Sequence, residues 1–171
     1  MHASQKIAQY LREAKASEDA LVRVLQSQIA MTPAGPYRSG LETHLEETRG
    51  HSRQLSSRIG ELAGSRDPVG MFVGLTEEIL GQTMALAKTP LDLMRGAGRE
   101  EKVLKNAKDA AATEALEIAT YTAIECLASS LGDEQTAELA RRIRSDEEKM
   151  LALIMEELPA LTAAVVRATS T

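Results

Sequence analysis

The chain of 171 residues is poor in aromatic side chains, with one Phe, three Tyr and no Trp. Strands are ordinarily enriched in aromatic and β-branched residues, whereas Ala, Leu, Glu and Arg, which are abundant here, favour helices. The shortage of aromatic residues therefore argues against a β-rich fold and favours an all-α one.

Cysteines and long apolar runs are also scarce. Cys126 is the only cysteine and cannot form an internal disulfide, and the first residues lack the apolar core and cleavage site of a signal peptide. No apolar stretch approaches the ~18 residues needed to span a bilayer. From these features we expect a soluble, cytoplasmic protein with no membrane partner.

Clusters of positive charge are missing as well. The net charge is −5 at pH 7, and no run of Lys and Arg is present that could neutralise a row of phosphates. The charge pattern therefore indicates that nucleic acid is not a partner.

The hydrophobic pattern divides the chain into five helical segments of one domain, residues 1–171. With 43% apolar residues, the chain can form a single well-packed core. The expected helices span about 4–31, 37–64, 68–88, 99–131 and, after Gly132 and Asp133, a last segment that Pro159 perturbs. We expect an antiparallel four-helix bundle, with the shorter 68–88 helix between its two hairpins.

Acidic residues interrupt the apolar stripes of three of these helices. The stripe of the first helix passes through Glu18, that of the fourth through Glu114 and Glu117, and that of the last through Glu147. Burying an ionised carboxylate is costly, so such a group needs protons, cationic partners or bound metal. These four residues should therefore mark a polar site inside the bundle.

The second helix contributes histidines to the same region. His44 and His51 lie on its stripe, and Glu47 follows His44 by three residues and precedes His51 by four. All three side chains can therefore converge on one side of the helix.

Glutamates from facing helices, accompanied by imidazole, are the donor set that suits a pair of ions such as Fe(II) or Mn(II). We predict a site for two iron ions, with manganese as the alternative. His44 and His51 could each be a ligand or a hydrogen-bond partner of a ligand carboxylate, and Tyr121 could be a donor to the site or a core residue. The predicted metal ligands are Glu18, His44, Glu47, His51, Glu114, Glu117 and Glu147.

Three segments resemble the ferritin-like stress proteins of the YciE/YciF type, and more narrowly an actinobacterial-looking branch of them. They are YLREAKASEDALVRVLQSQIAMTPAGPYRSGLETHLEETRGHSRQL (10–55), PLDLMRGAGREEKVLKNAKD (90–109) and ATEALEIATYTAIECLASSLGDEQTAELARRIRSDEEKML (112–151). The resemblance implies a ferritin-like bundle whose ligands are Glu18, Glu47 with a histidine, Glu114 with Glu117, and Glu147. It also implies iron oxidation, or reaction with dioxygen or peroxide, in a stress response.

The pattern departs from ferritins and rubrerythrins in one respect. Those proteins usually show Glu-x-x-His on two helices, and this chain contains no such motif. A site formed here would be richer in carboxylate. The alternative is a non-catalytic helical protein whose buried acids form a polar network and whose role lies in dimerisation or partner binding.

The 68–88 helix should be a packing surface. Gly70, Gly74 and Gly81 permit close backbone approach, and the neighbouring apolar residues would remain exposed in a four-helix core. We therefore expect a homodimer formed through this helix.

Overall fold

The structure is a computed structural model that describes residues 3–64 and 98–170, and this part of the chain is helical apart from short turns. It contains α1 (Ala3–Met31), α2 (Pro36–Gly64), α4 (Arg99–Ser130) and α5 (Glu134–Thr169). The four long helices predicted from the sequence are thus confirmed. The predicted 68–88 helix, with its three glycines, lies outside the described residues.

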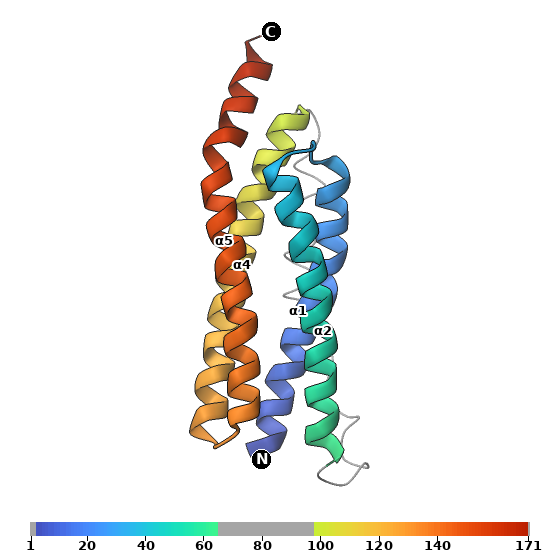
Figure 1. Ribbon diagram of the computed structural model, residues 1–171, viewed down its shortest axis with the longest axis vertical. Coiled ribbons are helices and arrows are strands. Elements are labelled where there is room, and N and C mark those ends of the chain that lie inside the picture. Colours follow the sequence, from blue (N-terminus) through green and yellow to red (C-terminus); the bar gives the residue numbers. More distant parts are fainter. Residues whose placement is uncertain (1–2, 65–97, 171) are drawn as a thin grey trace.

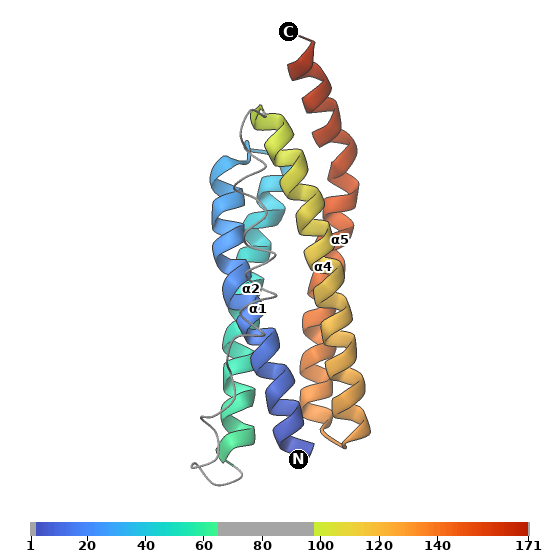
Figure 2. The ribbon, with the colours of Figure 1, turned by 180° about the vertical axis from the view of Figure 1, so that it is seen from behind.

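The helices form two antiparallel hairpins that pack side by side (Figures 1 and 2). Within the hairpins, α1 packs on α2 and α4 on α5, and between them α1 contacts α4 and α2 contacts α5. Each helix therefore has two neighbours, which is the arrangement of a four-helix bundle.

Each helix turns one stripe of side chains toward the bundle axis. The buried residues of α2 and α4 recur at alternating spacings of four and three, as expected for helices that pack nearly along one another. On α2 they are Tyr37, Leu41, His44, Thr48, His51 and Leu55. On α4 they are Val103, Ala107, Ala110, Glu114, Glu117, Tyr121, Ile124 and Ala128.

The apolar core is divided into two clusters along the bundle. One cluster contains Leu11, Leu55, Ile124 and Ile143, among others, and the second contains Leu25, Leu41, Ala107 and Ile154. On all four helices, the buried acidic or imidazole residues lie between the members of one cluster and those of the other. A polar layer thus crosses the middle of the bundle with apolar packing on both sides.

The turn between α4 and α5 has the chemistry that the sequence predicts. Gly132 adopts a left-handed conformation (φ 74°), and the amide of Asp133 donates to the carbonyl of Ala128 at 2.9 Å, which closes the end of α4. Asp133 then caps α5 by accepting from the amide of Thr136.

The last helix is longer than the sequence indicated. Pro159 lies inside α5, which continues to Thr169 and extends past the other helices (Figure 1). A proline removes one backbone hydrogen bond, but a helix can continue through it. Within the described ranges, no helix is long and apolar enough to cross a membrane.

Candidate metal centre

The polar layer contains four glutamates and two histidines that are almost completely buried. Glu18, Glu114 and Glu147 have exposed fractions of 0%, and Glu117, His44 and His51 have 1–3%. They come from all four described helices. The inward orientation that the sequence predicts for these six residues is confirmed.

Two groups of three side chains lie within the layer, and each could hold a metal ion. One group is Glu18, His51 and Glu147, and the other is His44, Glu114 and Glu147. Within each group, one potential ligand atom per residue lies within 4.8 Å of the other two. We call these groups the Glu18 triad and the Glu114 triad.

Glu147 belongs to both triads and presents a different oxygen to each. Its Oε1 lies 3.1 Å from Nδ1 of His51, and its Oε2 lies 3.4 Å from Nε2 of His44. A carboxylate that faces two donor groups in this way is placed to bridge two ions.

Each histidine has a carboxylate on the side facing away from the triads. His51 donates from Nε2 to Oδ2 of Asp146 at 3.3 Å, and Nδ1 of His44 lies 3.5 Å from Oε2 of Glu47. Such outer carboxylates commonly orient the imidazole of a metal-binding histidine. The nitrogen left facing the triads is Nδ1 in His51 and Nε2 in His44.

Two of the predicted ligands lie outside both triads. Glu47 is half-buried, with 35% of its side chain exposed, and contacts the outer side of His44. Glu117 is buried, and its Oε1 accepts a hydrogen bond from the hydroxyl of Ser17 at 3.1 Å.

Many polar atoms of the layer have no hydrogen-bond partner among the described residues. They include both oxygens of Glu114 and of Glu147, one oxygen of Glu18 and of Glu117, both ring nitrogens of His44, and Nδ1 of His51. Several lie 3.1–3.6 Å from an oppositely charged group, but without hydrogen-bond geometry. Buried polar atoms rarely lack a hydrogen-bond partner unless a water molecule or an ion binds them.

The charges of the layer fit two divalent cations. Within residues 3–64 and 98–170, no Lys or Arg forms an ion pair with the four buried glutamates; their only ion-pair partners there are the two histidines. Four ionised carboxylates carry four negative charges, which two divalent ions would neutralise while the imidazoles remain neutral. The residues present therefore fit a carboxylate-rich dinuclear site.

Without metal, the layer must bind protons instead. Burial opposes the charged form of His44, but the nearby carboxylates of Glu114, Glu147 and Glu47 outweigh it and raise the pKa of His44 to about 9. Burial likewise opposes charge on His51, and Glu147 and Glu18 raise its pKa to about 10. Burial raises the pKa of Glu147 to about 7, although His51 counteracts it.

Two tyrosines accompany the triads. The hydroxyl of Tyr121, itself buried, donates a hydrogen bond to Oε1 of Glu18, while Oε2 of Glu18 has no hydrogen-bond partner among the described residues. Tyr37 is buried near Glu114, and burial, with that negative charge, raises its pKa above the ordinary value. Of the two roles that the sequence leaves open for Tyr121, the structure shows both: its hydroxyl donates to Glu18, and its ring belongs to an apolar cluster of the core.

A comparison with protein families identifies the family to which the chain belongs. The family model of a domain of unknown function, DUF892, matches residues 3–167. The chain belongs to the DUF892 family. The match covers α1, α2 and α4 completely, α5 as far as residue 167, and every residue of the polar layer. None of the curated proteins matches the chain.

Solved structures share the DUF892 chain's fold at low sequence identity. A protein from Xanthomonas campestris is 20% identical with a TM-score of 0.75, covering 99% of this chain and 100% of its own. The Escherichia coli stress protein YciF is 18% identical, also with a TM-score of 0.75, covering 95% and 98%. YcfI, described as a putative structural protein from Rhodopseudomonas palustris, is 20% identical with a TM-score of 0.72, covering 90% and 93%.

These similarities show a shared fold and the resemblance to YciF expected from the sequence. The narrower actinobacterial branch stays a prediction. One residue of the site that is missing from the predicted set is Asp146, which contacts His51. Its position immediately before Glu147 and one helical turn before the exposed Lys149 was the available signal.

Proposed function

We propose that this DUF892 protein binds two divalent metal ions, with iron as the first choice and manganese as the second, in its polar layer. The observation that carries the proposal is the shared carboxylate of Glu147, whose two oxygens face two histidines in two triads of buried, unsatisfied ligand atoms. A polar layer of this composition is costly to bury without cations.

The residues would have distinct roles. Glu147 would bridge the two ions, Glu18 with His51 would complete one position, and Glu114 with His44 the other. Glu117 would supply a further carboxylate, since its pKa is raised by burial and also by the charges of Glu18, Glu147 and Glu114, which lie nearby. Glu47 and Asp146 would orient the histidines from outside.

Iron bound in such a site would supply one-electron chemistry toward dioxygen or peroxide, which fits a role in iron oxidation or oxidant removal during stress. The protein's own contribution is to exclude water. Apolar clusters close the layer from both ends of the bundle, and the access of small oxidants depends on their packing. YciF is described as a stress protein.

The alternative proposal is a non-catalytic helical protein whose buried acids form a polar network. The hydrogen bonds from Tyr121 to Glu18 and from Ser17 to Glu117 are features that such a network would also contain. The two proposals predict different metal contents for the protein and different effects on metal binding when Glu147 is replaced.

Anaerobic titration with Fe(II) and Mn(II) separates them. The wild type should bind two ions per chain, and Glu147→Gln, which keeps the side chain's shape, should weaken both positions by at least about tenfold because it removes the shared ligand. Glu148→Gln is the matched control, since Glu148 is the next residue and is 54% exposed. Absence of metal binding in the wild type, or equal binding by Glu147→Gln, would support the polar network instead.

A further inference from the structure

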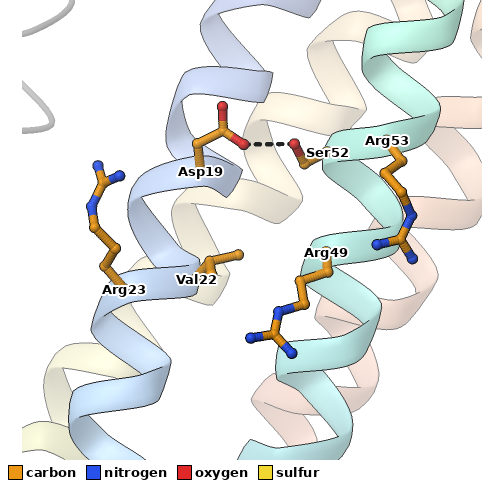
Figure 3. A pocket seen from close by; sticks show the side chains of 6 residues that line it. All are labelled: Asp19, Val22, Arg23, Arg49, Ser52 and Arg53. Atoms are coloured by element: carbon orange, nitrogen blue, oxygen red, sulfur yellow. Dashed lines mark hydrogen bonds between the residues drawn. The ribbon is translucent and has the colours of Figure 1, made fainter.

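A groove lies on the outer face of the α1/α2 hairpin, away from the bundle axis. It is a shallow groove open to solvent, with a volume of about 370 Å³, and it is lined by Asp19, Val22, Arg23, Arg49, Ser52 and Arg53. Figure 3 shows the arginines spread around it, Arg23 from α1 and the other two from α2, with Asp19 and Ser52 joined by a hydrogen bond between the helices.

The negative charge in the groove is already matched. Asp19, the only acidic lining residue, accepts from Nζ of Lys15 and from the hydroxyl of Ser52, each at 2.6 Å. Arg49 is paired with Glu46 on its own helix. The charge of Arg23 also acts on Asp19, although no ion pair among the described residues joins a carboxylate to Arg23 or Arg53. With three arginines and one aspartate in its lining, the groove keeps an excess of positive charge.

This concentration of guanidinium groups is unfavourable by itself. Arg49 and Arg53 are four residues apart on α2, where like charges repel, and Arg23 adds a third charge from α1. The chain as a whole has a net charge of −5, so the groove is opposite in sign to the molecule. An anion bound between the arginines would remove the repulsion.

We propose that this groove binds a small oxyanion with two or more negative charges. Guanidinium groups form paired hydrogen bonds with phosphate and carboxylate oxygens, and three of them line this groove. The volume of the groove exceeds that of a single phosphate ion. Phosphate-bearing compounds and polycarboxylates share this chemistry.

The groove lies directly outside the polar layer but shares no residue with it. Asp19 follows Glu18 in α1, and Ser52 follows His51 in α2, so the Asp19–Ser52 hydrogen bond joins the two helices next to the Glu18 triad. None of the six lining residues is a candidate metal ligand. Oxyanion binding can therefore be tested separately from metal binding.

The test is calorimetric titration of the full-length chain with pyrophosphate and, in a second arm, citrate, in metal-free buffer with chloride at matched ionic strength. We expect one saturable site per chain. The double substitution Arg23→Gln/Arg53→Gln should weaken binding by at least about tenfold, because it removes the two charges without an ion-pair partner. Both residues are exposed, so the helical content and melting temperature should not change.

Arg142→Gln is the matched control. Arg142 is an arginine of α5 with 56% of its side chain exposed, and it lies outside the groove. Tighter binding of pyrophosphate would assign the site to phosphate compounds, and tighter binding of citrate would assign it to polycarboxylates. The proposal is overturned if neither anion saturates, or if the groove variant and the Arg142 variant bind equally.

Discussion

At the scale of single residues, the buried carboxylates differ in what surrounds them. Glu18 has a tyrosine hydroxyl on one oxygen, whereas both oxygens of Glu114 lack a partner among the described residues. The two triads are therefore chemically unequal although each contains one histidine and shares Glu147. An ion beside Glu18 would be bound by a carboxylate that is already held in place.

Tyr121→Phe tests this difference. The ring remains, but Glu18 loses its donor, so the free energy of unfolding should fall by about 1–3 kcal/mol in the metal-free protein. A two-step Mn(II) titration should show that the affinity for one of the two ions falls much more than the affinity for the other. Tyr10→Phe is the control, because Tyr10 is a half-buried tyrosine of α1 outside the polar layer. An equal loss of affinity at both metal positions would show that Tyr121 does not act through Glu18.

The inward residues could be predicted from spacing, but their partners could not. Glu18, Glu114 and Glu147 lie on apolar stripes, so periodicity alone places them in the core. Glu47 and Asp146 are at stripe margins, where a small rotation of the helix decides between a metal ligand and an outer contact. That rotation is set by packing between helices, which one sequence does not display.

At the scale of helices, the α4/α5 turn is tied to the end of α2 by one side chain. Arg58 donates to Asp133, Thr136 and Gln135 at 2.7–2.9 Å and also to Glu61 on its own helix. Its side chain is only 13% exposed. Arg58 therefore links the cap of α5 to the other hairpin.

Arg58→Met should lower the free energy of unfolding by about 2 kcal/mol, because it removes several charged hydrogen bonds and leaves the partly buried Asp133 without its cation. Arg53→Met, at an exposed position five residues earlier on α2, should change it by less than about 0.5 kcal/mol. Urea denaturation of the two variants gives the comparison. Similar values for both would mean that the contacts of Arg58 do not stabilise the turn.

The helix boundaries were largely predictable because prolines, glycines and caps are local signals. The turn of the first hairpin lies between Thr32 and Pro36, and the turn of the second contains Gly132 and Asp133. The continuation of α5 beyond Pro159 was not predicted, since a proline only weakens a helix locally and neighbouring turns can hold it together. The predicted dimer helix at 68–88 lies outside the described residues, and dimerisation stays a prediction.

At the scale of the whole molecule, the polar layer should make the stability of the metal-free protein depend on pH. The folded pKa values of His44 (about 9) and His51 (about 10) exceed the unfolded value of 6.5, so the stability that they contribute is complete below pH 6.5 and is lost as pH rises toward 10. Glu147 acts in the same direction between its unfolded value of 4.5 and about 7.

With a chelator present, the melting temperature should therefore fall by at least about 5 °C between pH 6 and pH 9.5. Saturating Mn(II) should reverse the trend, because metal displaces protons and binds better as pH rises. Thermal unfolding followed by circular dichroism measures both. Greater stability at pH 9.5 than at pH 6 in the chelated protein would contradict the protonation of the polar layer.

The proposal that two metal ions share Glu147 in the middle of the bundle can be tested by anomalous scattering from a crystal grown anaerobically with Fe(II), with data collected on both sides of the iron edge. We expect two peaks, each beside one histidine and both in contact with the carboxylate of Glu147. A polar layer without an anomalous peak, with metal bound only elsewhere or not at all, would contradict it.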